Sequence, residues 1–238
     1  MVYDALNYIM SFQDRKDAAE QLAKKLEQWL EKNRTIEKHQ NSDAVVILAI
    51  PRGGVVIGDI LSAILDVKLD IIVSRKIRAP ENPELAIGAV MPDGSYILNQ
   101  YIVNMLKVTQ TYIHAEVDAQ TREIETRLLY FRGSKNYDNE LNDKIVILVD
   151  DGIATGSTIF AAAKWINNNQ KCRELVVAVP VAPPDIIIKL KKEVSDKVIV
   201  LYSPEIFSAV GQFYKDFEQV SDDKVREIMK RHGYAVKN

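Results

Sequence analysis

The sequence has little of several features that mark special classes of protein. A single cysteine, Cys172, excludes an internal disulfide and favours a reducing compartment. Ten glycines and eight prolines in 238 residues are too few for long disordered or collagen-like stretches. No apolar run approaches the roughly 18 residues that span a bilayer, and the N-terminal residues lack the pattern of a signal peptide. We therefore expect a cytoplasmic protein without a membrane segment.

The sequence also has no large excess of positive or of negative charge. The 31 Lys and Arg residues face 33 Asp and Glu residues, which leaves a formal net charge of −2. A protein that binds nucleic acid regardless of sequence is normally strongly basic, so direct DNA binding is not expected. The hydrophobic content of 47% and the charged content of 27% are typical of a soluble globular protein.

Short apolar runs alternate with amphipathic segments along most of the chain. Strands are predicted at 44–50, 69–76, 144–150, 174–181 and 197–203, and helices at 14–30, 55–65, 157–166, 185–192 and 222–230. This alternation predicts an α/β fold with a doubly wound, mostly parallel sheet. Because neither an internal repeat nor a linker rich in Pro, Gly or Ser is visible, we expect one domain over residues 1–238.

The stretch at 77–132 departs from this alternation. It contains three prolines at its start, and Asp93-Gly94 lies between two alternating apolar runs, which is a β-hairpin signal. One long helix is predicted from about residue 101 to residue 131. We expect the stretch to be an inserted hairpin and helix hood that covers the main sheet. The charged face of its helix is expected to be solvated or to contact a second copy, and is made of Glu116, Arg122, Glu123, Glu125 and Arg127.

The most informative segment is VILVDDGIATGST at 146–158. Its apolar residues predict a buried strand, and Asp150 and Asp151 follow at the carboxyl end, where parallel sheets bind ligands. The turn that comes next offers backbone N–H groups and hydroxyls beside a helix N-terminus, an arrangement that attracts phosphate. Gly156 lets a ligand approach the backbone. The two carboxylates suit sugar hydroxyls or Mg²⁺. The plain alternative is an acidic turn followed by a Ser/Thr helix cap.

This segment resembles the 13-residue phosphoribosyl pyrophosphate (PRPP) motif of the type I phosphoribosyltransferases. The wider layout of the chain is similar to a poorly characterised prokaryotic branch of that superfamily. The resemblance implies that Asp150 and Asp151 act in catalysis and meet the ribose hydroxyls or Mg²⁺, directly or through water. It also implies a site for the 5-phosphate of PRPP at Ala154, Thr155, Gly156, Ser157 and Thr158.

Two further segments agree with the resemblance. Arg52, Gly53 and Gly54 follow the first apolar strand, where the family binds pyrophosphate; a plain turn between strand and helix is the alternative reading. Arg75 and Lys76 end the second predicted strand and are expected to act in catalysis. The family closes a flexible cationic loop over its site at this point in the chain, and here the loop would contain Arg78, Pro80, Pro83 and Glu84. A solvated basic strand end is the alternative.

The segment at 203–217 resembles the purine-binding turn of hypoxanthine-guanine phosphoribosyltransferases. Phe207 is expected to stack on the base, with main-chain contacts from Ser208 and Ala209, unless these residues are ordinary packing residues. The chain departs from those enzymes at Ala154, where they carry an aspartate near the purine. The identity of the acceptor base is therefore open.

The resemblance implies Mg²⁺-dependent transfer of the phosphoribosyl group from PRPP to a small nitrogenous base, a purine first, with release of pyrophosphate. Such an activity would serve nucleotide salvage. The alternative is a regulatory protein that senses PRPP or a nucleotide in the same pocket without turnover. The family often forms dimers, and a homodimer is left open here.

Overall fold

The computed structural model describes residues 12–33, 42–137 and 141–236. Its centre is a five-stranded parallel sheet with the strand order β2-β1-β6-β7-β8. These strands are β1 (Val45–Ala49), β2 (Lys68–Ile71), β6 (Ile145–Val149), β7 (Glu174–Val181) and β8 (Lys197–Tyr202). The predicted α/β fold with a mostly parallel sheet is confirmed.

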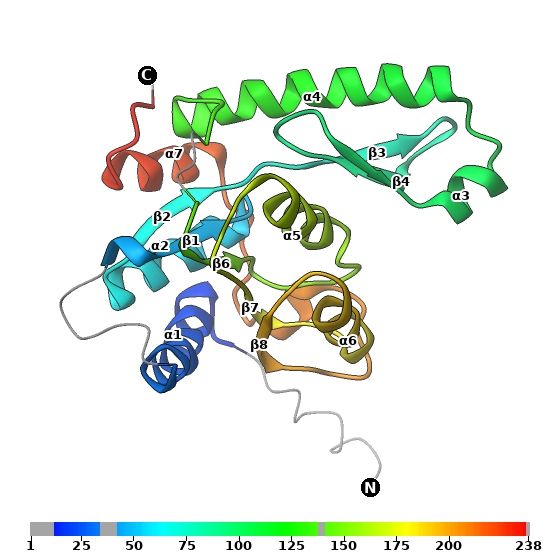
Figure 1. Ribbon diagram of the computed structural model, residues 1–238. Helices are drawn as coiled ribbons and strands as arrows, with labels where there is room; N and C mark the ends of the chain where they lie inside the picture. The colour runs from blue at the N-terminus through cyan, green and yellow to red at the C-terminus, as the bar shows by residue number, and fades with distance from the viewer. Residues whose placement is uncertain (1–11, 34–41, 138–140, 237–238) are drawn as a thin grey trace, which may run out of the picture.

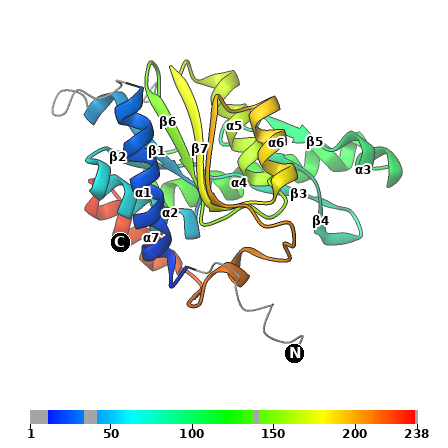
Figure 2. The same ribbon diagram turned by 90° about the horizontal axis from the view of Figure 1, so that it is seen from below.

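Helices cover both faces of this sheet, which explains why its strands are mostly apolar. All five residues of β1 and of β6 are buried, as expected for central strands of a parallel sheet. Helices α1 (Arg15–Lys32) and α2 (Gly53–Leu65) lie on one face, and α5 (Ser157–Asn169) and α6 (Pro184–Glu193) lie on the other (Figure 2). Helix α7 (Asp222–Arg231) packs against α2. Two short 3-10 helices, η1 (Ser42–Ala44) and η2 (Val210–Phe213), complete the main part.

The chain between β2 and β6 forms a second unit, which we call the β3–α4 unit (75–132). It contains an antiparallel sheet of β3 (Arg75–Ala79), β4 (Asn82–Val90) and β5 (Tyr96–Leu98), followed by α3 (Gln100–Met105) and α4 (Gln110–Arg132). Helix α4 runs along the top of the molecule in Figure 1, with β3 and β4 beneath it. The predicted hairpin at Asp93-Gly94 is confirmed, and Gly94 adopts the positive φ of 78° that the turn requires.

Two sequence-based boundaries in this region are wrong. The strand predicted at 69–76 ends at Ile71, and Arg75 and Lys76 instead begin β3, because the chain leaves the parallel sheet and starts the antiparallel one. The single helix predicted at 101–131 is two helices. Lys107 has a φ of 50° between them, and the Thr109 side chain caps α4 by accepting a hydrogen bond from the backbone N–H of Tyr112.

A buried ion pair fixes α4 to the parallel sheet. Arg132 at the end of α4 donates to Asp70 of β2 through Nε at 2.8 Å and Nη2 at 3.0 Å, and both side chains are almost completely buried. Apolar residues of α4 that the sequence placed on one face, such as Ile113 and Leu128, are also buried. The helix is therefore held in place along its length. In the part of the chain described, no helix has the length and apolar character needed to cross a membrane.

Candidate active site

The two adjacent carboxylates that follow β6 are not equivalent. The Asp151 carboxylate accepts hydrogen bonds from Arg15, at 2.9 Å from Nε and 2.8 Å from Nη2, and the side chains of Arg15 and Asp151 are only 11% and 14% exposed. Asp150 instead lines two neighbouring cavities. Asp151 is thus held inside the protein by a cation, whereas Asp150 is the acid that a ligand would meet.

Burial affects the protonation of both acids. Burial, and then the negative charge of Asp151, hold the pKa of Asp150 well above its usual range. Burial also raises the pKa of Asp151, but the charge of Arg15 and its hydrogen bond oppose that rise. Asp150 therefore has no strong cationic partner in the described structure. A cation that binds together with a ligand would lower the pKa of Asp150 more than that of Asp151.

The small-residue turn after the acids forms an open phosphate-sized recess. Gly156 has a φ of +75° and is the N-cap of α5, and no side chain caps this helix N-terminus. The predicted alternative, a Ser/Thr helix cap, is therefore wrong. The recess has a volume of about 180 Å³, and we call it the phosphate-loop cavity. It is lined by Asp150, by every residue from Gly152 to Ile159 and by Val210. Uncapped N–H groups and the helix dipole at this point favour an anion.

The turn between β1 and α2 packs directly on the acid pair. Its Pro51–Arg52 peptide bond is cis. A Cβ atom on Gly53 would lie 1.8 Å from Asp151 Oδ2, and one on Gly54 would lie 2.9 Å from Asp150 Cα. The resemblance implies that these glycines contact pyrophosphate. The packing shows in addition that only glycine fits here against the carboxylates. Arg52 contacts Asp222 at the start of α7, with 3.3 Å between Nη1 and Oδ1.

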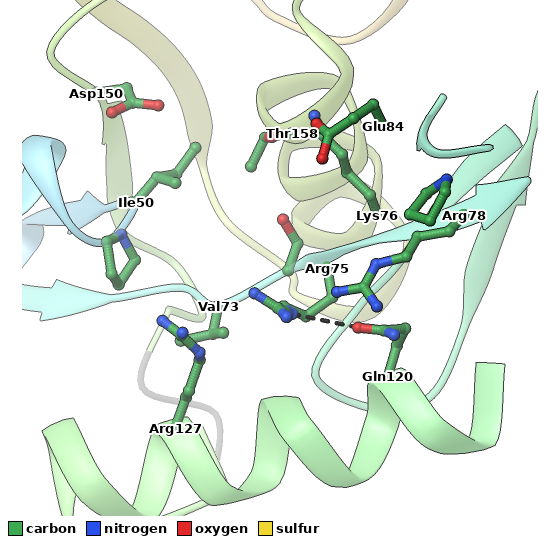
Figure 3. Close-up of a pocket in the computed structure, with 13 residues that line it drawn as sticks. Ile50, Val73, Arg75, Lys76, Arg78, Glu84, Gln120, Arg127, Asp150 and Thr158 are labelled. Atoms are coloured by element: carbon green, nitrogen blue, oxygen red, sulfur yellow. Dashed lines mark hydrogen bonds between the residues drawn. The ribbon is translucent and has the colours of Figure 1, made fainter. Parts of the chain in front are cut away.

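A second cavity of about 380 Å³ lies between the β1–α2 turn and the β3–α4 unit (Figure 3). We call it the cationic cavity. Its charged lining residues are Arg75, Lys76 and Arg78 of β3, Glu84 of β4, Arg127 of α4 and Asp150; its other lining residues are Ile50, Pro51, Val73, Ser74, Pro83, Gln120 and Thr158. The cationic loop predicted at 78–84 is a β-hairpin rather than an irregular loop.

The interpretation of the charged face of α4 as solvated is wrong for the part that faces this cavity. Arg127 lines the cavity, and Glu123 accepts from Arg127 Nε at 3.1 Å. Glu116 accepts a hydrogen bond of 3.4 Å from the backbone N–H of Arg78. Arg122 is exposed, as expected. No sequence pattern indicates Arg127 or Arg15 as site residues, because a cation on an amphipathic helix has the same local pattern whether it faces a site or the solvent.

The segment predicted to hold the base lies beside the motif. Val210 packs against Gly152 so closely that a Cβ there would lie 2.5 Å from Val210 Cγ1. The Phe207 ring packs on Phe213, with 5.0 Å between ring centroids. The backbone N–H groups of Ser208 and Ala209 donate to Gln212 Oε1 at 3.1 and 3.2 Å, so the donors predicted to contact a base already have an acceptor within the chain.

Comparison with known families agrees with this arrangement. The phosphoribosyl transferase domain matches residues 14–217, which include the residues that line both cavities, the acid pair, and the segment at 203–217, which we call the base segment. The chain belongs to the phosphoribosyl transferase family.

Two proteins are similar to this phosphoribosyl transferase domain over most of its length. One is a Mycobacterium tuberculosis protein named "Putative phosphoribosyl transferase". It is 37% identical over 220 residues, which are 92% of this chain and 46% of that protein. The chain therefore spans about half the length of the curated relatives it matches. A Thermus thermophilus protein of known crystal structure is 33% identical, with a TM-score of 0.70, 93% of this chain covered and 99% of that chain covered.

The phosphoribosyl transferase domain offers few ligands for a metal ion of its own. In the described ranges, no three His, Cys, Asp or Glu residues are arranged to hold a metal ion together. Among the residues that line the phosphate-loop cavity, Asp150 is the one carboxylate. Because Mg²⁺ in phosphate-binding sites is commonly held by one or two carboxylates together with substrate oxygens and water, this donor set fits a metal ion that arrives with PRPP.

Proposed function

We propose that the protein transfers the phosphoribosyl group of Mg²⁺-bound PRPP to a nitrogenous base and releases pyrophosphate. The observation that carries this proposal is that the phosphate-loop cavity and the cationic cavity share two lining residues, Asp150 and Thr158. The order along the site is therefore the phosphate-loop cavity, then Asp150, then the cationic cavity. A ligand with one phosphate at one end, a ribose in the middle and a diphosphate at the other end matches that order. PRPP is such a ligand.

Each part of PRPP has a set of partners in this arrangement. The 5-phosphate would accept hydrogen bonds from the turn at 154–158 and the N-terminus of α5. Asp150 would accept hydrogen bonds from the ribose hydroxyls or hold Mg²⁺, while Asp151 keeps its contact with Arg15. The pyrophosphate would meet Arg75 and Lys76, which line the cationic cavity. Arg52, Gly53 and Gly54 follow Pro51 of the cavity wall but do not line the cavity themselves, so in this proposal they contact the pyrophosphate from the adjoining turn.

The chain's own cations supply the catalytic effect in this proposal. When bound, Mg²⁺ neutralises part of the negative charge that collects on the departing pyrophosphate. Charge-assisted hydrogen bonds contribute about 1.5–3 kcal/mol each, and they raise the rate only where they strengthen as pyrophosphate becomes a separate anion. Because Arg75 and Lys76 belong to β3, which lies over the cavity, they would also restrict the access of water to the ribosyl carbon.

The acceptor is proposed to be a nitrogenous base, a purine first. The base segment (203–217) contacts the motif through Val210, which also lines the phosphate-loop cavity. In this proposal the base bound there attacks the ribosyl carbon next to that cavity. Phe207 provides an aromatic ring in this segment, and stacking on a base is worth about 1–3 kcal/mol. Ala154 leaves the phosphate loop without the carboxylate that partners a 6-oxopurine, so adenine is to be tested beside the oxopurines.

The first experiment measures pyrophosphate release from PRPP and Mg²⁺ in the presence of adenine, guanine, hypoxanthine, xanthine, uracil or orotate, with a no-base control. Release that depends on one base supports the enzyme and identifies its acceptor. The Asp150→Asn variant, in parallel, is expected to lose this release. No release with any base, with PRPP binding confirmed by a thermal shift, would contradict the transferase and favour a sensor of PRPP.

A further inference from the structure

Two arginines from different elements share one carboxylate at the wall of the cationic cavity. Glu123 Oε1 lies 3.1 Å from Arg127 Nε and 3.9 Å from Arg75 Nη2. Arg127 extends from α4 and Arg75 from β3, and their guanidinium groups approach the same space in Figure 3. The single charge of Glu123 thus neutralises only part of the positive charge of the two arginines, so this place can bind a second anion.

The position of Arg75 is fixed by a buried amide. Gln120 of α4 is only 6% exposed, and its Oε1 accepts from Arg75 Nε at 3.2 Å. Gln120 Nε2 in turn donates to Glu116 at 3.1 Å, which orients the amide. The guanidinium of Arg75 is therefore positioned before any ligand binds, which reduces the entropy lost when it binds an anion.

The electrostatics of this wall also favour an anion. The charged residues that line the cavity comprise four cations and two acids, Glu84 and Asp150. Burial, and then the positive charge of Arg127, lower the pKa of Arg75. Like charges held close together in a partly buried place repel each other, and an anion between them relieves that repulsion.

We propose that Arg127 of α4 binds the pyrophosphate group of PRPP together with Arg75 of β3. This inference rests on the proposed function. The phosphate-loop cavity is suited to the single 5-phosphate of PRPP. The pyrophosphate group at the other end of PRPP would therefore lie in the cationic cavity, beside Arg75 and Arg127. Two guanidinium groups present forked donors to two phosphoryl groups, which a single lysine does not do.

This assignment gives the β3–α4 unit a part in substrate binding beyond covering the site. Glu123 is 44% exposed, so it can turn toward solvent when a more highly charged anion takes its place between the arginines. Arg127 is a binding residue in this proposal, because it touches the pyrophosphate itself.

The experiment compares the binding of two probes, Mg²⁺-pyrophosphate and ribose 5-phosphate, by titration calorimetry. For Arg127→Gln we expect the Kd for Mg²⁺-pyrophosphate to rise at least about ten-fold, since a charge-assisted contact is lost, while the Kd for ribose 5-phosphate changes less than about two-fold. Arg122→Gln removes the same charge from the exposed side of the same helix and should leave both Kd values unchanged. Arg127→Lys should give an intermediate Kd for Mg²⁺-pyrophosphate, because it keeps the charge without the fork.

The possible outcomes separate this inference from the proposed function. An unchanged Kd for Mg²⁺-pyrophosphate in Arg127→Gln would overturn the role of Arg127. An equal loss of affinity for both probes in Arg127→Gln and Arg127→Lys would also overturn it. In either case, binding of ribose 5-phosphate by the wild type would still support the PRPP site. If the wild type binds neither probe, the proposed function fails and this inference fails with it. A thermal melt of each variant identifies misfolding, and Arg127→Lys then decides the result.

Discussion

Arg15, in the first turn of α1, holds Asp151, which lies 136 residues later in the chain, through two nitrogens of its guanidinium group. The same guanidinium lies 3.9 Å from the centroid of the Phe217 ring, and its Nη1 donates to the Glu218 carbonyl at 2.8 Å. Arg15 thus links the acid pair after β6 to the C-terminal end of the segment at 203–217.

Replacement of Arg15 by Gln is expected to lower the free energy of unfolding by about 3 kcal/mol at neutral pH, because it leaves the buried Asp151 carboxylate without its counter-charge. The loss should shrink on acidification, since Asp151 then takes up a proton and no longer carries an unpaired charge. Urea unfolding at several pH values measures both effects. Lys16→Gln is the control: its contact with Glu20 is long and exposed, so a change of less than about 1 kcal/mol is expected. Equal losses in the two variants would contradict the importance of the pair.

The two acids of the motif should respond in opposite ways to loss of charge. Burial, and then the negative charge of Asp151, disfavour the ionised form of Asp150 and raise its pKa, so Asp150→Asn should raise the melting temperature of the ligand-free protein by a few degrees at pH values where the wild-type carboxyl is ionised. A carboxyl group with a raised pKa destabilises the fold as the pH rises through that pKa, so the gain should disappear at acidic pH, where the wild-type carboxyl is neutral. Asp151→Asn should instead destabilise by about 3–5 kcal/mol, because the buried Arg15 keeps its contacts with Phe217 and Glu218 but loses its counter-charge.

Thermal melts of the two variants between acidic and neutral pH check this contrast. A lower melting temperature for Asp150→Asn at neutral pH would show that Asp150 makes a stabilising contact in the free protein. A stable Asp151→Asn variant would show that Arg15 does not depend on that carboxylate.

Gly53 is expected to tolerate no side chain. Because a Cβ at this position would lie 1.8 Å from Asp151 Oδ2, Gly53→Ala must displace either the turn or the carboxylate, at a cost of about 1–3 kcal/mol. Binding of both ribose 5-phosphate and Mg²⁺-pyrophosphate should weaken at least about ten-fold, which is about 1.4 kcal/mol. The control, Ala63→Gly on the exposed side of the same helix, loses about 1 kcal/mol of stability through helix propensity alone and should bind both ligands normally. Normal binding by Gly53→Ala would contradict the packing argument.

The sequence predicted the parallel sheet well because its central strands, β1 and β6, are wholly buried and therefore continuously apolar, and β7 and β8 are apolar over most of their length. The prediction of one strand failed at residues 72–76, where the chain passes from the parallel sheet to the antiparallel one within a few residues and no Gly or Pro marks the change. Ile72 still bonds to Ala49 of the parallel sheet, whereas Arg75 already pairs with Val90. Both environments favour the same residue types, so no local pattern marks the boundary.

The candidate site divides in the same way. Residues adjacent in the sequence, such as the acid pair and the turn at 154–158, were predicted because a ligand site made by one strand and its following turn is a local feature. Arg15 and Arg127 come from helices that reach the site only through tertiary packing. Arg127 is carried there by α4, whose end is fixed by the pair between Arg132 and Asp70. The amphipathic pattern of a helix does not indicate which of its cations faces a cavity.

Arg52 should bind pyrophosphate more tightly once Asp222 no longer competes for it. Its Nη1 lies 3.3 Å from Asp222 Oδ1, and both side chains are about a third or more exposed, so the contact is worth at most about 1 kcal/mol. Asp222→Asn should therefore lower the Kd for Mg²⁺-pyrophosphate by up to about five-fold and leave the Kd for ribose 5-phosphate unchanged. Asp223→Asn, at the next position of α7, breaks a contact with Arg226 instead and serves as the control. Arg52→Ala should weaken pyrophosphate binding and abolish any effect of Asp222→Asn in the double variant. If Asp222→Asn weakens pyrophosphate binding, Asp222 positions Arg52 for the ligand rather than competing with it.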